Sequence, residues 1–172
     1  MQTSLILSII ADDKPGLVEN LSNIISQHQG NWLESRMSQM AGKFAGIVRV
    51  EIPEQMADQL VKQLENIKST NCHIHFEVSN LPPVPQTTTY QVTLQLVGND
   101  HPGIVKEISA ALAQRHINVI DLETECSPAP MSSDMLFKAE ATLQVPTNIN
   151  KEKLALDLES LANELIVEIN MN

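Results

Sequence analysis

The stretch DDKPGLVENLSNII (Asp12–Ile25) decides the fold, because a second version of it, NDHPGIVKEISAAL (Asn99–Leu112), follows later in the chain. The two stretches align at a constant offset, which places Gly16 opposite Gly103. The similarity continues downstream, with a short insertion in the second copy at Ser127–Asp134. An internal repeat of this length indicates two copies of one structural unit.

The same order of periodicities occurs in each copy. Apolar residues alternate before the Asp-x-Pro-Gly turn, and apolar residues at helical spacing follow it. Continuing along the chain, the pattern predicts strand–helix–strand–strand–helix–strand, twice. A unit this short does not close a doubly wound parallel sheet; it fits the ferredoxin-like plan of four antiparallel strands with both helices on one face. We therefore predict an α+β fold with a first domain over residues 1–79, a proline-rich linker over 80–88 and a second domain over 89–172.

Composition and charge exclude several classes of function. The chain has 172 residues, of which 42% are hydrophobic but only 3% aromatic, which predicts globular domains with aliphatic cores. Its formal net charge of -10 argues against binding to a nucleic-acid backbone or to an anionic membrane surface. The sequence lacks an apolar run long enough to span a membrane and a cationic leader, so we expect a cytoplasmic protein. No phosphate loop, nucleophile elbow or Cys/His signature indicates an enzyme, and nothing calls for a cofactor.

The repeated Asp-x-Pro-Gly-[Leu/Ile]-Val turn within a βαββαβ unit resembles the ACT domain. Two such units without an attached enzyme resemble the glycine cleavage system transcriptional repressor family. This resemblance implies regulation by a small molecule, usually an amino acid such as glycine, bound at interfaces between ACT domains. It also implies action through a partner transcription activator, without direct nucleic-acid contact. A homo-oligomer is a further expectation, because apolar residues lie on both sides of the predicted strands.

The two turns are the first candidate ligand sites. An amino acid's carboxylate would be favoured by the free N–H groups at a helix start, and an aspartate could meet its ammonium group. Plain helix capping by Asp and Pro is the alternative explanation. The candidate residues at the turns are Asp13, Pro15, Gly16 and Leu17 in the first copy, and Asp100, Pro102, Gly103 and Ile104 in the second.

Asn31 and Asn118 open the second strand of each copy and complete the candidate set. In ACT domains the start of this strand faces the first turn, so the resemblance implies that both residues contact the ligand. A turn conformation that tolerates Asn is the alternative. Trp32 becomes Val119 in the second copy, so the two sites cannot be equivalent.

Three further features have competing interpretations. His73, His75 and Glu77 share one strand face and either hold a metal, as in a small hydrolase, or are merely solvated; the solvated face is favoured. Asp121, Glu123 and Glu125 form an acidic stripe that either meets a basic partner or is solvated. Both cysteines, Cys72 and Cys126, lie in strand patterns and are expected to be buried and unreactive. The leading hypothesis is a non-enzymatic tandem ACT regulator, and an ACT adaptor without a ligand is the main alternative.

Overall fold

The computed structural model describes residues 1–66, 72–79, 88–130, 134–160 and 165–171. The chain divides into two compact units, Met1–Val84 and Pro85–Asn172. Most of the predicted linker, residues 80–87, lies outside the described residues.

Each unit has the predicted order of elements. The first unit consists of β1 (Gln2–Asp12), α1 (Leu17–Gln27), β2 (Asn31–Met40), β3 (Lys43–Pro53), α2 (Glu54–Asn66) and β4 (Cys72–Val78). The second unit consists of β5 (Thr89–Asn99), α3 (Ile104–Gln114), β6 (Asn118–Pro128), β7 (Met135–Pro146), α4 (Lys151–Glu159) and β8 (Ile166–Met171).

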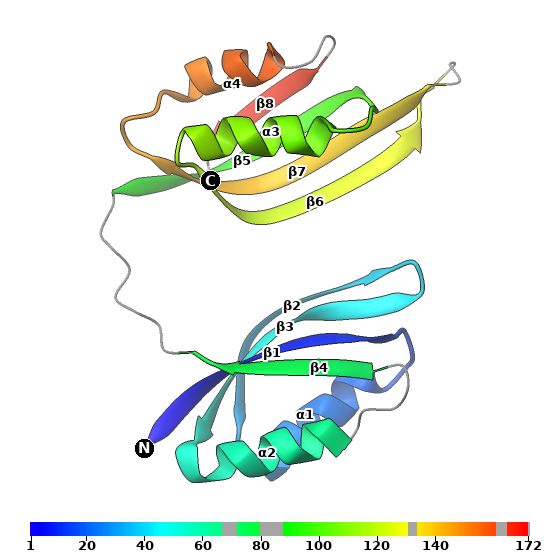
Figure 1. Ribbon diagram of the computed structural model, residues 1–172, viewed down its shortest axis with the longest axis vertical. Helices are drawn as coiled ribbons and strands as arrows, with labels where there is room; N and C mark the ends of the chain where they lie inside the picture. The colour runs from blue at the N-terminus through cyan, green and yellow to red at the C-terminus, as the bar shows by residue number, and fades with distance from the viewer. Residues whose placement is uncertain (67–71, 80–87, 131–133, 161–164, 172) are drawn as a thin grey trace. The chain divides into compact units, whose positions relative to one another are not determined.

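Both sheets are antiparallel and have the same topology. The strand orders are β2-β3-β1-β4 and β6-β7-β5-β8. Figure 1 shows that α1 and α2 cover one face of the first sheet, and that α3 and α4 cover one face of the second. The predicted pair of ferredoxin-like βαββαβ units is therefore confirmed.

The cores follow from strand alternation, because every second residue of the central strands points toward the helices. Leu5, Leu7 and Ile9 of β1 are buried, and so are their counterparts Val92, Leu94 and Leu96 of β5. Helix α1 buries Leu21, Ile24 and Ile25 against the first sheet. Helix α3 buries Ile104, Ile108, Ala111 and Leu112 against the second. As expected from the composition, both cores are almost wholly aliphatic.

The edge strands differ between the units. In the first unit, Trp32 and Met37 of β2 pack against the core. The rest of β2 is mostly exposed, and in the second unit the edge strand β6 is exposed along nearly its whole length, including the positions of Trp32 and Met37. Since β2 and β6 occupy the same place in their sheets, this difference separates two otherwise similar folds.

Candidate functional site

The two Asp-x-Pro-Gly turns connect the first strand of each unit to its first helix. Gly16 and Gly103 are the N-cap residues of α1 and α3, and both have left-handed backbone conformations with φ of 87° and 103°. Neither helix start has a side-chain cap hydrogen bond. The alternative explanation, that the aspartates cap these helices, is therefore not supported, and the glycines are explained by their left-handed backbone conformation.

The backbone on the strand side of each turn is anchored to the neighbouring hairpin. The Asp13 N–H donates to the carbonyl of Gly42 at 3.1 Å, and the Asp100 N–H donates to the carbonyl of Met135 at 2.8 Å. Asp13, Pro15 and Gly16 are exposed, as are Asp100, Pro102 and Gly103. Leu17 is half-buried and Ile104 is buried, so these two residues attach the helices to their cores. Each turn thus offers an exposed carboxylate next to an uncapped helix start.

The surroundings of the two turns differ in charge. In the first unit, Lys14 lies in the turn, and the Lys43 ammonium pairs with the Asp12 carboxylate. In the second unit, the His101 side chain lies 3.9 Å from the Glu107 carboxylate in the first turn of α3. The first turn therefore carries a lysine, Lys14, where the second turn carries His101, while Lys43 is already engaged by Asp12.

Asn31 and Asn118 are exposed but lie far from the turns of their own units. The register pairs Asn31 with Glu51, and Glu51 with Ser4 near the start of β1. Asp12, which leads into the turn, is eight residues further along β1, so roughly 26 Å of extended strand separates the two ends. Asn118 has the same position in the second unit, through Gln144 and Gln91. Within one unit, the structure brings the turn residues together but does not bring the asparagines to them.

The histidine cluster on β4 lies on the outer face of the first sheet. His73, His75 and Glu77 are exposed, and the His75 ring lies 3.5 Å from the Glu77 carboxylate. Among the described residues, no group of three or more His, Cys, Asp or Glu side chains is arranged to hold a metal ion. This strand face therefore resembles an ordinary solvated surface.

One cysteine differs from expectation. Cys72 is buried, but Cys126 of β6 is exposed, because its edge strand is uncovered. Loss of water around the Cys126 sulfur, together with the negative charge of Asp100 and a hydrogen bond to its carboxylate, raises the pKa of the thiol. Burial raises the pKa of Cys72 as well. Both thiols are thus poor nucleophiles at neutral pH; loss of water acts on both, and negative charge acts on Cys126 in addition.

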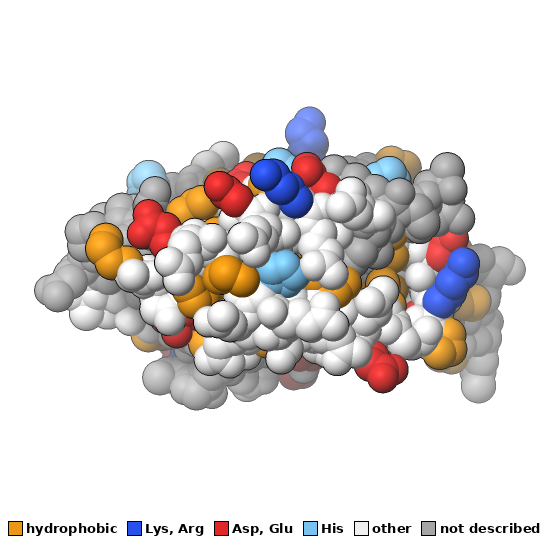
Figure 2. Space-filling model, turned by 90° about the horizontal axis from the view of Figure 1, so that it is seen from below, with side chains coloured by type: hydrophobic (Ala, Val, Ile, Leu, Met, Phe, Trp, Pro, Cys, Tyr) orange, Lys and Arg blue, Asp and Glu red, His pale blue; other side chains and the backbone are white. Residues whose placement is uncertain are grey.

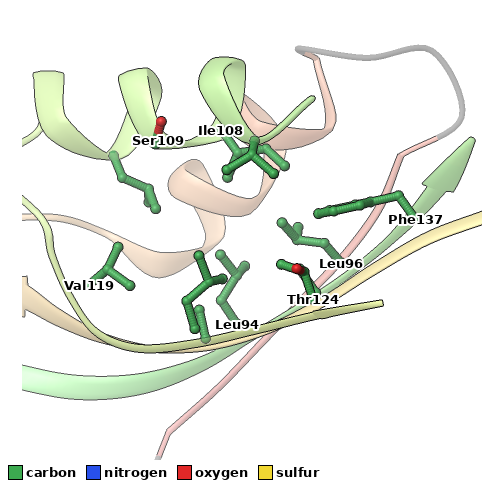
Figure 3. Close-up of a pocket in the computed structure, with 12 residues that line it drawn as sticks. Leu94, Leu96, Ile108, Ser109, Val119, Thr124 and Phe137 are labelled. Atoms are coloured by element: carbon green, nitrogen blue, oxygen red, sulfur yellow. The ribbon is translucent and has the colours of Figure 1, made fainter. Parts of the chain in front are cut away.

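The sequence did not predict an apolar cavity in the second unit. Figure 3 shows side chains from α3, β5, β6 and β7 directed into it, among them Leu94, Ile108, Val119 and Phe137. The signal was present in the sequence as the change from Trp32 to Val119, which removes a large side chain from the edge of the core.

The distribution of charge can be followed on one face of the described residues. On the face drawn in Figure 2, Lys and Arg side chains are few and lie apart, next to acidic ones, and hydrophobic side chains form small separate spots. No helix among the described residues has the length and apolar character that a membrane crossing requires.

Comparison with known proteins identifies the first unit. Residues 3–78 match the family model of the ACT domain. The chain is also 19% identical to the glycine cleavage system transcriptional repressors of Escherichia coli K12 and Shigella flexneri, over 99% of this chain and 90% of those proteins.

Solved structures share the two-unit fold. A crystal structure of an unknown protein from Galdieria sulphuraria has a TM-score of 0.82 at 24% identity, covering 100% of this chain and 99% of that one. A putative glycine cleavage system transcriptional repressor has a TM-score of 0.70 at 16% identity, with the same coverage. The first unit therefore matches the ACT domain, and the second unit has the same element order and strand topology. Along almost its whole length the chain is similar to glycine cleavage system transcriptional repressors.

Proposed function

We propose that the chain is a tandem ACT-domain protein and a non-enzymatic transcriptional regulator that senses a small ligand and acts through a protein partner. The observation that carries the proposal is similarity along almost the whole chain to proteins named as glycine cleavage system repressors. The ligand is an amino acid, with glycine as the first candidate, and the partner is a transcription activator.

The ligand site that we propose is the Asp-x-Pro-Gly turn. The carboxylate of an amino acid would accept hydrogen bonds from the uncapped N–H groups of the helix start, where the helix dipole also favours negative charge. The ammonium group would meet the exposed carboxylate of Asp13 or Asp100. The turn of the first unit is the stronger candidate, because Lys14 adds positive charge at the position that His101 occupies in the second turn.

The partner surface that we propose is the acidic outer face of the second sheet. Asp121, Glu123 and Glu125 alternate along β6 and are all exposed. On β7, Glu140 lies opposite Glu123 and extends the negative surface inward, whereas Lys138 lies opposite Glu125 and limits the acidic surface at that end. A partner of basic character would complement this face and associate faster at low salt.

The first experiment is a thermal-shift screen of the full chain against the amino acids. A ligand at a hundred times its dissociation constant adds about 2.7 kcal/mol to the stability of the unit that binds it. Asp13→Asn keeps the shape of the side chain and removes its charge, so it should weaken binding at least tenfold. Asp100→Asn is the matched control that separates the two turns. If no amino acid stabilises the chain, the adaptor alternative takes the place of the sensor.

The second experiment tests the partner surface. Glu123→Lys should weaken binding of the partner activator and reduce its dependence on salt. Glu152→Lys makes the same charge change on the exposed surface of α4 and should leave binding unchanged. Equal losses in both variants would show that only net charge matters.

Regulation requires that ligand and partner influence each other. We expect a coupling of about 1–3 kcal/mol between the two binding events, and by linkage it is equal in both directions. Calorimetric titration of the amino acid with and without the partner measures it. Equal affinities in the two titrations would show that the amino acid does not regulate binding of the partner.

A further inference from the structure

The cavity of the second unit lies between α3 and the sheet, on the side of the edge strand β6 (Figure 3). Its volume is about 40 Å³. The inner wall is formed by buried side chains of the core, including Leu94, Leu96 and Ile108. The outer rim is formed by Val105, Val119 and Leu122, which are 44%, 37% and 51% exposed. The cavity is therefore apolar and reaches the surface between helix and edge strand.

The first unit has large side chains at the same place. Trp32 of β2 pairs with Val50, whereas its counterpart Val119 pairs with Leu143. Both Trp32 and Met37 pack against the first core. In the second unit, Val119 and Thr124 take these positions and line the cavity instead. The indole and thioether groups that close the first core have thus been replaced by short side chains.

A second pair of positions confirms this difference. In the first unit, Met37 lies opposite Gly46, and a Cβ on Gly46 would come within 2.7 Å of the Met37 Cγ. In the second unit, Thr124 lies opposite Ala139. The short side chain of Thr124 leaves room for the methyl group of Ala139, but the two together do not restore the volume that Met37 fills.

A third pair of positions also leaves more space in the second unit, at the centre of the cavity. Val48 of the first unit corresponds to Ala141 of the second, and Ser35 corresponds to Leu122. Leu122 is the one larger residue on the edge strand, but it is half-exposed and lies at the rim. The space above Ala141 therefore stays open.

We propose that this cavity binds the branched aliphatic end of a small molecule. A water molecule needs about 10–15 Å³ of such volume, so the cavity holds about three groups of that size, the number of carbons in an isopropyl group. Water gains little there, because the wall offers it no hydrogen-bond partners. The site is separate from the turns of the proposed function and does not depend on them.

The cavity accepts only the apolar end of the molecule, because its exposed lining is apolar. Ser109 lies beside the cavity, but its hydroxyl donates to the Lys106 carbonyl of its own helix at 3.1 Å. The polar end of the ligand therefore stays in water at the open rim, and the ligand class is a short branched aliphatic molecule with one uncharged polar end, such as a branched alcohol.

The test uses 3-methylbutan-1-ol as the probe and the methyl NMR signals of the full chain as the readout. We expect saturable shifts of the Val105, Ala139 and Ala141 methyl groups, with a dissociation constant on the order of millimolar for so small a ligand. Glycerol, which lacks the branched chain, should cause none. If the branched alcohol leaves these signals unchanged up to its solubility limit, the proposal is wrong.

Variants taken from the first unit locate the site. Val119→Trp reproduces Trp32 and should weaken probe binding at least tenfold by filling the cavity. Ala141→Val reproduces Val48 and makes the same test with a smaller change, should the tryptophan variant fail to fold. Trp32→Val should open the equivalent space in the first unit and add a second set of shifts. Unchanged binding in a folded Val119→Trp or Ala141→Val variant would refute the site.

The oligomeric state tests whether a second copy of the chain, instead of a small molecule, covers the cavity. If the wild-type chain self-associates and Val119→Trp makes it monomeric, a second copy covers this surface and the small-molecule proposal falls. Equal sedimentation of the two proteins, together with loss of probe binding in the variant, supports the proposal.

Discussion

Gly46 shows how tightly the first unit is closed at its edge, and its replacement by alanine is the sharpest test of that packing. A Cβ at this position would lie 2.7 Å from the Met37 Cα and would also collide with the carbonyl oxygen of Arg36. Because two of these contacts are with backbone atoms of β2, the strand itself has to move away from β3. Rotation of a side chain cannot relieve the clash.

Overpacking of this kind costs about 1–3 kcal/mol. The lower backbone entropy of alanine in the unfolded chain returns about 0.4–1 kcal/mol. The expected net loss of stability for Gly46→Ala is therefore about 1–2 kcal/mol. In a domain of this size, that corresponds to a drop in Tm of roughly 5–15 °C.

Tryptophan fluorescence and a second substitution at Met37 test this prediction. Trp32 is the only tryptophan in the chain and packs at the same edge, so its fluorescence reports the unfolding of the first unit. Met37→Thr should cost stability in the wild-type background. In the Gly46→Ala background it should cost less, because the shorter side chain removes the contact between the new Cβ and the Met37 Cγ, while the contacts with the backbone of Arg36 and Met37 remain. Equal effects of Met37→Thr in both backgrounds, or an unchanged midpoint for Gly46→Ala, would refute this account of the edge.

Three other predictions follow from the described residues. Gly16→Ala should destabilise the first unit by about 1–2 kcal/mol despite the open space around it, because φ of 87° is strained for any side chain; chemical denaturation measures this. In a Cys72→Ala background, alkylation of Cys126 should require a higher pH than an ordinary thiol, and Asp100→Asn should shift the rate profile back toward lower pH, because the negative charge and hydrogen bond of Asp100 raise the pKa of the thiol. The isolated protein should not shift duplex DNA in a gel at physiological salt, since its net charge is -10; a salt-sensitive complex would contradict this.

The fold was predictable because the repeat constrains it twice. Each copy has the same turn and the same order of strand-like and helix-like patterns. A helix or strand wrongly assigned in one copy would therefore have disagreed with the assignment in the other. The alternation of Val92, Leu94 and Leu96 directly gives the face that packs against the helices. Local patterns of this kind determine elements and their buried faces, and chain length then leaves only a small set of topologies.

The site was less predictable, because it depends on which strand ends lie next to each other in the folded sheet. Asn31 was expected to face the turn, but pairing in an antiparallel sheet places the start of β2 at the far end of β1. Cys126 was expected to be buried, because its strand looks like any other in sequence. Whether an edge strand is covered depends on the position of the neighbouring helix, and no local pattern records it.

The repeated Asp-x-Pro-Gly turn has two explanations, a ligand site and a structural turn. The left-handed φ of Gly16 and Gly103 is sufficient to explain both glycines, so their repetition cannot by itself distinguish a ligand site from a structural turn. The aspartates can make that distinction, because neither helix start is capped by a side chain and the charge of Asp13 is not needed to begin α1. A charge that contributes little to folding but much to amino-acid binding would mark the turn as a site. The number of binding sites separates the two proposals. Both units have the turn, so a ligand of the turn should bind at two related sites with different affinities. The cavity belongs to the second unit, so a ligand of the cavity should bind at one site.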